Sequence, residues 1–176
     1  DTLVAVTGAG SGIGRATALA FAAEGAELIV SDIDGAAAAE TAAAINDPGG
    51  LAHPYVVDVA DAAAVERYAE QVCADHGVPD IVVNNAGIGV AGSFLDTPAE
   101  EFDRVLDVNL GGVVNCCRAF GGRLVQRGTG GHVVNVASMA AYAPLSSLSA
   151  YCTSKAAVYM FSDCLRAELD AAGVGL

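Results

Sequence analysis

Short apolar runs alternate with longer segments of helical periodicity along most of the chain. The apolar runs are rich in β-branched residues and alternate little with polar ones, which is typical of strands covered on both faces of a sheet. We expect strands at residues 3–6, 27–31, 53–57, 80–84 and 132–137. Because β-α-β crossovers are right-handed and build parallel sheets, the pattern predicts an α/β fold. The expected architecture is a doubly wound parallel sheet in a three-layer α/β/α sandwich, with strand order 3-2-1-4-5.

The predicted helices carry two kinds of start signal. Asp61 precedes an alanine-rich run and can cap its first turn. Thr97, Pro98 and Glu100 have the spacing of a capping box with proline in the first turn. We expect the two longest helices at about residues 97–127 and 149–172.

Composition and charge narrow the possible classes of function. With 176 residues, of which 53% are hydrophobic and 16% charged, the chain can bury one substantial core, so we expect a single domain over residues 1–176. The formal net charge of −13 would repel nucleic-acid phosphates and anionic lipids, and we expect neither nucleic acid nor membrane as a partner. No apolar run approaches the roughly 20 residues that span a bilayer, and no leader precedes residue 3, so we expect a cytoplasmic protein. The five cysteines lack CxxC spacing and are expected to be reduced.

The two ends of the sequence indicate a longer parent protein. The chain enters an apolar strand by residue 3 without an initiating Met, and it stops at residues 173–176, where another strand begins. We therefore expect a domain that is incomplete at its C-terminus, with the last strands absent. The fifth strand is then expected to form an open edge of the sheet.

A glycine-rich turn follows the first strand and opens a helix. Glycines permit a tight turn, close approach of the backbone to a pyrophosphate and close packing of the helix on the strand. The helix N-terminus then stabilises the anion. A glycine-rich turn alone is also compatible with a purely structural loop. The candidate cofactor-binding residues of this turn are Gly8, Ser11, Gly12, Ile13 and Gly14.

Asp32 ends the second predicted strand, some twenty residues beyond the turn. A carboxylate there can accept hydrogen bonds from both hydroxyls of an adenosine ribose, which favours NAD. The same carboxylate would repel the 2′-phosphate of NADP, and the next residue is Ile33 rather than a cation. Alone, Asp32 could equally be a surface carboxylate at a strand end.

With these features, the sequence resembles the short-chain dehydrogenase/reductase family in its compact, NAD-preferring type. The resemblance covers nearly the whole chain in motif order and spacing. It implies a Rossmann fold and an oxidoreductase that transfers a hydride between a nicotinamide and a secondary alcohol or ketone. The motifs that carry it, beyond the glycine turn, are Asn84-Asn85-Ala86-Gly87, Asn109, Ser138 and Tyr151-x-x-x-Lys155.

The resemblance also implies a role for each motif residue. Tyr151 is the acid/base, Ser138 orients the substrate oxygen, and Lys155 also holds the nicotinamide ribose. Asn109 holds a water that passes protons from Lys155 to solvent. The expected adenosine side of the site is lined by Asp58, Val59, Asn85, Ala86 and Gly87.

The pairing of Tyr151 with Lys155 has a chemical reason. Lys155 is the only lysine, and on a helix a spacing of four residues places both side chains on one face. A phenol with a pKa of about 10 is a poor base at neutral pH, but a neighbouring ammonium stabilises the phenolate. Singly, Tyr151 could be a packed helix tyrosine, Ser138 a loop cap and Asn109 a satisfied buried amide. Together they favour catalysis, because a buried lone lysine and a mid-helix asparagine both cost stability.

The remaining segments bear on substrate and metal. Residues 139–148 form a mostly apolar loop that predicts one wall of a substrate pocket and favours an apolar or bulky alcohol. Ile88, Gly89 and Val90 either line another wall or are packing residues. The histidines at positions 53, 76 and 132 are expected to be structural, and no metal site is expected because no grouping has metal-ligand spacing.

Two other functions stay open at this point. One is a nucleotide-sugar epimerase or dehydratase of the extended family type, whose glycine turn is usually one residue shorter. The other is a non-catalytic NAD-binding module. The sequence also resembles the dehydrogenase domain of an actinobacterial protein that is fused to an α/β-hydrolase domain. In related enzymes the two long helices pack between subunits, so a homodimer or homotetramer is expected.

Overall fold

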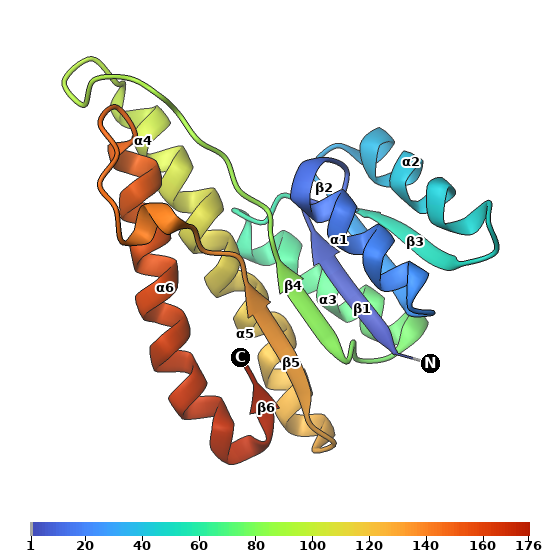
Figure 1. Ribbon diagram of the computed structural model, residues 1–176. Coiled ribbons are helices and arrows are strands. Elements are labelled where there is room, and N and C mark those ends of the chain that lie inside the picture. The colour runs from blue at the N-terminus through green and yellow to red at the C-terminus, as the bar shows by residue number, and fades with distance from the viewer. Residues whose placement is uncertain (1) are drawn as a thin grey trace.

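Helices cover both faces of a parallel six-stranded sheet in the computed structural model, which describes residues 2–176 (Figure 1). The sheet order is β3-β2-β1-β4-β5-β6, and each neighbouring pair of strands is parallel. The strands are β1 (Leu3–Thr7), β2 (Glu27–Asp32), β3 (Leu51–Val56), β4 (Ile81–Asn84), β5 (Gly131–Asn135) and β6 (Val174–Gly175). This confirms the predicted α/β class and the order of the first five strands.

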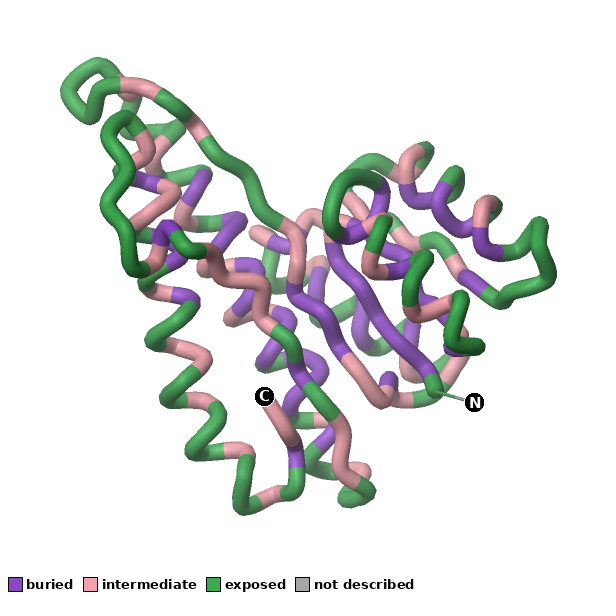
Figure 2. Tube along the Cα trace, viewed as in Figure 1, coloured by how far each residue is buried: buried purple, intermediate pink, exposed green. Residues whose placement is uncertain are grey.

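Two apolar clusters, one on each face of the sheet, form the core. Successive strand residues point to opposite faces, so each buried strand contributes to both clusters. Strand β1 is buried along its whole length (Figure 2). The helices α1 (Gly12–Ala23) and α2 (Gly35–Asn46) cover one face. The other face is covered by α3 (Ala62–His76), α5 (Gly112–Arg127) and α6 (Ser149–Leu169). No helix within residues 2–176 is long and apolar enough to cross a membrane.

The sheet has a sixth strand, which corrects the expectation that every strand after the fifth is absent. Gly173 has a left-handed backbone (φ +73°) that turns the chain after α6, and β6 then pairs with the first two residues of β5. Two residues are too few to produce a periodic sequence pattern, but their backbone groups gain ladder hydrogen bonds at an unpaired edge. The open edge is therefore confined to the carboxyl half of β5, where Val134 is 43% exposed.

A π-helical turn interrupts the first long helix. The expected helix at residues 97–127 consists of α4 (Ala99–Leu106), a π segment (Asp107–Gly111) and α5. The Gly112 N–H donates to the carbonyl of Asp107, five residues earlier. Sequence periodicity does not reveal such a turn, because one added residue is a small departure from a 3.6-residue repeat that is followed over only a few turns. The turn contains Asn109, one of the candidate catalytic residues.

One of the two predicted helix starts is confirmed and the other is wrong. Asp61 caps α3, because its Oδ1 accepts from the N–H groups of Ala63 and Ala64 at 2.9 and 3.0 Å. Thr97 does not cap α4. Its hydroxyl donates instead to the carbonyl of Ser93 at 2.9 Å, and the helix begins after Pro98. The local turn before the helix competes for the same hydroxyl.

The five cysteines are free thiols. Cys116 and Cys117 lie on the buried face of α5, in the core. Burial raises the pKa of the Cys116 thiol to about 12 and that of Cys117 to about 11. Both thiols are therefore protonated at neutral pH and are poor nucleophiles.

Candidate active site

A cleft of about 640 Å³ opens at the carboxyl ends of the strands. It lies where the strand order changes direction, between β1 and β4, which is the usual ligand-binding position in an open parallel sheet. All predicted site residues except Gly14 and Asn109 line it, namely Gly8, Ser11, Gly12, Ile13, Asp32, Asp58, Val59, Asn85, Ala86, Gly87, Ser138, Tyr151 and Lys155. The structure thus brings together residues that are up to 147 positions apart in the sequence (8 to 155).

The glycine turn has the backbone geometry that its composition predicts. Gly8 and Gly12 have φ values of +63° and +52°, in the left-handed region that favours glycine. Gly14 lies below the turn rather than in the cleft, and a Cβ there would overlap the carbonyl oxygen of Gly8. Ser11 precedes α1 without forming a side-chain cap, so its hydroxyl leaves the first N–H groups of the helix to other acceptors.

Hydrogen bonds join the glycine turn to the segment after β4. The Asn85 amide donates from Nδ2 to the carbonyls of Thr7 at 3.0 Å and Gly8 at 3.2 Å. In return, Thr7 Oγ1 accepts from the N–H groups of Asn85 and Ala86 at 3.1 and 3.2 Å. Sequence reasoning missed Thr7, whose only signal is a polar residue that ends an apolar strand. These two side chains fix the width of the cleft floor.

Asp32 is held with both carboxylate oxygens oriented. Oδ2 accepts from the Gly10 N–H at 2.9 Å, and Oδ1 accepts from the Asp34 N–H at 3.0 Å. The carboxylate therefore supports the glycine turn as well as lining the cleft. Its neighbour Ile33 also lines the cleft and is 58% exposed, so this end of the site offers an acceptor and an apolar surface.

Asp58 and Arg104 also line the cleft, and Asp58 follows β3, the strand beside β2. Asp58 Oδ1 accepts from the Ala60 N–H at 3.0 Å, while Oδ2 lies 3.4 Å from the guanidinium of Arg104. Arg104 projects from α4 and was not predicted, because a single arginine on an amphipathic helix gives no functional signal. Asp58 does not cap α3, since that role belongs to Asp61.

Ser138, Tyr151 and Lys155 form the wall opposite the glycine turn. Ser138 follows β5, and its Oγ accepts from the Ala140 N–H at 3.1 Å, which leaves the hydroxyl proton free to donate. Tyr151 lies in the first turn of α6 and Lys155 one turn later, with Nζ 5.9 Å from the centre of the tyrosine ring. Lys155 is 4% exposed, and its ammonium donates to the Val136 carbonyl at 2.7 Å. Burial lowers the pKa of Lys155 from its ordinary value of 10.5.

Asn109 is completely buried behind the cleft. Its Oδ1 accepts from the Ile88 N–H at 2.8 Å, and its Nδ2 donates to the Ile88 carbonyl and to Ser154 Oγ, both at 2.9 Å. The Ser154 hydroxyl donates in turn to the Tyr151 carbonyl at 2.7 Å. Asn109 therefore connects the π turn to the loop after β4 and, through Ser154, to the backbone of the candidate acid/base.

Comparison with known proteins identifies the family. The sequence model described as short chain dehydrogenase matches residues 2–176. The chain belongs to the short-chain dehydrogenase family. Short-chain dehydrogenases are oxidoreductases, so the predicted family and enzyme class are confirmed.

Individual relatives agree with this assignment. The chain is 80% identical over 176 residues to the "Probable oxidoreductase EphD" of Mycobacterium tuberculosis, matching 100% of this chain and 30% of that protein. It is 40% identical to the D-threitol dehydrogenase of Mycolicibacterium smegmatis, matching 96% of this chain and 65% of that protein. A short chain dehydrogenase/reductase from Burkholderia phymatum, solved in complex with NAD, superimposes with a TM-score of 0.95 at 32% identity. The match covers 99% of this chain and 63% of the Burkholderia chain.

Two of the three histidines lie together beside one carboxylate, a grouping that was not expected from the sequence. Strands β2 and β3 are adjacent and in register, so His53 lies beside the start of β2, and α3 returns the chain to the same place at His76. Both imidazoles contact the carboxylate of Glu27, at 2.9 and 3.5 Å. Residues separated by more than twenty positions show no ligand spacing in the sequence. This group lies outside the short-chain dehydrogenase cleft.

Asn109→Ala is expected to destabilise the domain. The substitution removes three hydrogen bonds of a completely buried amide, including the one to the buried Ser154 hydroxyl, so we expect the free energy of unfolding to fall by about 2–4 kcal/mol. Chemical denaturation measures the change. Asn115→Ala is a matched control, because the Asn115 amide makes a single hydrogen bond, to the Val59 carbonyl. Equal losses for the two variants would contradict the role of Asn109 in joining three segments.

Proposed function

We propose that the chain is an NAD-dependent oxidoreductase that transfers a hydride between nicotinamide and a secondary alcohol or ketone, with Tyr151 as the acid/base. The observation that carries the proposal is that one cleft is lined by a glycine turn and Asp32 at one end and by Ser138, Tyr151 and Lys155 at the other. The first set is suited to a dinucleotide and the second to proton transfer.

The shape of the cleft supports NAD as the cofactor. The positive φ of Gly8 and Gly12 brings the backbone against the space where a pyrophosphate would lie, at the N-terminus of α1. Asp32 would accept hydrogen bonds from the adenosine ribose and disfavour a 2′-phosphate. Ala86 and Gly87 line the floor of the cleft and carry no side chain larger than a methyl group. This leaves room for the cofactor to cross from β1 to β5.

The residues at the other end of the cleft would handle the proton. When bound, NAD supplies a carbon that accepts the hydride of the alcohol C–H bond, leaving a ketone, NADH and one proton. Tyr151 takes that proton from the alcohol oxygen, and Ser138 donates a hydrogen bond to the same oxygen. The Lys155 ammonium would stabilise the phenolate form of Tyr151, which must be present before Tyr151 can take the proton. Reduction of a ketone reverses each step.

Gly87 provides the exit for the proton in this proposal. A Cβ on Gly87 would lie 3.2 Å from Asn109 Oδ1 and 3.6 Å from Lys155 Nζ, so the glycine leaves a space beside both polar atoms. One water held there by the free lone pair of Asn109 Oδ1 would connect Lys155 to solvent. This is the relay that the family resemblance implies for Asn109.

The activity can be tested with the full-length protein, NAD+ and a panel of secondary alcohols from polyols to bulky apolar compounds. We expect formation of NADH, followed by its absorbance, with at least one member of the panel. The exposed apolar side chains on the loop after Ser138 favour the bulkier compounds: Met139, Tyr142 and Leu145. Tight binding of NADH without turnover of any alcohol, ketone or nucleotide sugar would instead support the non-catalytic module.

Asp32→Asn is expected to weaken the preference for NAD+ over NADP+. Removing the charge eliminates repulsion of the 2′-phosphate and weakens the ribose hydrogen bonds, so the ratio of the two kcat/KM values should fall by about 10–100-fold. The amide oxygen can still accept from Gly10 or Asp34, which keeps the turn in place. Asp34→Asn is the control, because Asp34 caps α2 without lining the cleft. An unchanged ratio for Asp32→Asn would contradict its proposed contact with the ribose.

The setting of the domain is also proposed rather than established. The chain spans 30% of the length of the mycobacterial relatives that are 80% identical to it, which supports the prediction that it is the dehydrogenase domain of a longer, fused protein. We further propose a cytoplasmic location and a homodimer or homotetramer formed through α5 and α6. Light scattering of the full-length protein tests the assembly, and a monomer at high concentration would contradict it.

A further inference from the structure

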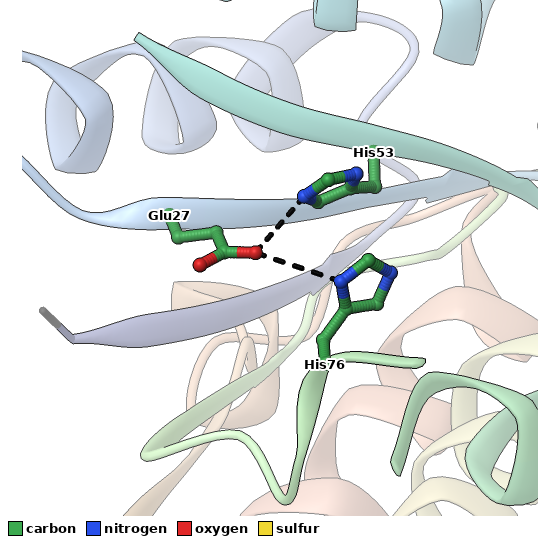
Figure 3. A group of neighbouring side chains, drawn as sticks. All are labelled: Glu27, His53 and His76. Atoms are coloured by element: carbon green, nitrogen blue, oxygen red, sulfur yellow. Dashed lines mark hydrogen bonds and ion pairs between the residues drawn. The ribbon is translucent and has the colours of Figure 1, made fainter. Parts of the chain in front are cut away.

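A compact group of two histidines and one glutamate lies at the opposite edge of the sheet from the cleft. Glu27 begins β2, His53 lies in β3, and His76 ends α3. Figure 3 shows both imidazoles directed at the same carboxylate. Each residue offers one ligand atom, and these atoms all lie within 4.8 Å of one another: His53 Nε2, His76 Nδ1 and Glu27 Oε1.

The hydrogen bonds around His76 indicate which ring nitrogen carries the proton when the ring is neutral. Tyr55 donates its single hydroxyl proton to Asp75 at 3.1 Å, and the Tyr55 oxygen lies 2.9 Å from His76 Nε2. The Tyr55 oxygen must then accept from Nε2–H, which leaves Nδ1 without a proton.

That lone pair faces Glu27 Oε1 at 3.5 Å. Two acceptor atoms at this separation repel each other unless a positive charge lies between them. The charge can be an additional proton on His76 or a metal ion. His53 Nε2 approaches the same oxygen at 2.9 Å, and the two imidazole rings are stacked with centres 4.0 Å apart. A divalent ion bound between the three atoms would accept a lone pair from each of the three side chains.

We propose that Glu27, His53 and His76 bind one transition-metal ion of the zinc class. Two imidazole nitrogens and one carboxylate are a ligand set that zinc uses, with the fourth position open to water. Nitrogen ligands also favour such ions over magnesium or calcium. The site is independent of the proposed dehydrogenase function, because no residue of the group lines the cleft.

The dimensions of the group suit such an ion. A tetrahedral ion with bonds of about 2.0–2.1 Å holds its ligand atoms roughly 3.3 Å apart. The distances from Glu27 Oε1 to the two histidine nitrogens, 2.9 and 3.5 Å, lie on either side of that value. The side chains of His53 and Glu27 are 30% and 26% exposed, which gives an ion a path from solvent.

Neighbouring side chains would orient the ligands. Metal-bound histidines usually donate their other ring N–H to a fixed acceptor, which sets the tautomer. Tyr55 supplies that acceptor for His76, and Asp75 fixes the hydroxyl of Tyr55 in turn. A bound ion would join β2, β3 and the end of α3, so it would stabilise this edge of the sheet against unfolding.

The test uses the full-length protein freed of metal with a chelator and titrated with Zn²⁺ by calorimetry. The wild type should bind one equivalent that both His53→Gln and His76→Gln lose. His132→Gln is the matched control and should keep that equivalent, because His132 lies on β5 outside the group. Zn²⁺ should raise the thermal midpoint of the wild type and of His132→Gln but not that of the other two variants.

Two further measurements separate this site from other modes of binding. Tyr55→Phe should keep the stoichiometry and weaken the affinity by about 10–100-fold, as loss of an outer hydrogen bond does. Co²⁺ should give a visible spectrum without the near-ultraviolet thiolate band, which separates the group from the cysteines. The same stoichiometry in the wild type and in both histidine variants, or no binding by the wild type, would overturn the proposal and leave a cluster held by protons alone.

Discussion

Tyr151→Phe is expected to lower kcat for alcohol oxidation by about 10²–10⁴-fold, the usual contribution of a positioned acid/base. The substitution removes one oxygen from the wall that also carries Ser138 and Lys155, and it leaves the packing of the ring in the first turn of α6 unchanged. Binding of NADH should stay within about twofold, since a phenylalanine ring fills the same space. Steady-state kinetics with the best alcohol of the panel and a fluorescence titration with NADH measure the two quantities.

Tyr159→Phe provides a matched control on the same helix. Tyr159 lies two turns further along α6, is 37% exposed and does not line the cleft. Removal of the Tyr159 hydroxyl should leave both kcat and NADH binding unchanged. Equal activity of Tyr151→Phe and the wild type over the whole panel would show that another group transfers the proton.

Lys155→Met is expected to reduce activity by at least about 100-fold without reducing stability. Lys155 is 4% exposed, and its ammonium donates one hydrogen bond to a protein acceptor, the Val136 carbonyl. Burying a charge with so little compensation costs stability, whereas methionine has a similar length and no charge. The free energy of unfolding at pH 7 should therefore equal that of the wild type or exceed it by up to about 2 kcal/mol, after the lost hydrogen bond is included.

The pH dependence of this difference follows from the direction of the pKa shift. Burial lowers the pKa of Lys155 in the folded state from its ordinary value of 10.5. The cost of the buried charge is therefore fully present below the folded-state pKa and disappears as pH rises from that pKa toward 10.5. The wild type should gain stability relative to Lys155→Met over that interval. A variant that keeps full activity, or loses more than about 3 kcal/mol at pH 7, would contradict a lysine buried for function.

The sheet and the juxtaposition of the candidate catalytic pair could be predicted because local patterns determine them. Repeated strand and helix segments, with right-handed crossovers, leave few alternatives for the order of the first five strands. Tyr151 and Lys155 lie one helical turn apart, so their shared face follows from helix geometry alone. Asp32 could be placed because strand ends at the carboxyl edge of a parallel sheet are a restricted set of positions.

Features that depend on distant pairs could not be read from the sequence. The hydrogen bonds between Thr7 and Asn85 join positions 78 residues apart, and no local pattern marks either residue as a partner of the other. The histidine group needs the register of β2 against β3 and the end point of α3 together. Asn109 could be singled out as a polar residue in an apolar helix, but its bonds to Ile88 and Ser154 depend on a π turn that leaves no periodic signal.

A crystal structure of the full-length protein with NAD+ tests the central claim most directly, because it needs no knowledge of the substrate. We expect the adenosine ribose within hydrogen-bonding distance of Asp32, the pyrophosphate against the turn at Gly12, and the nicotinamide facing Ser138 and Tyr151. Its ribose should contact Lys155. A cofactor bound in the reverse direction, or bound outside this cleft, would contradict the proposed hydride transfer.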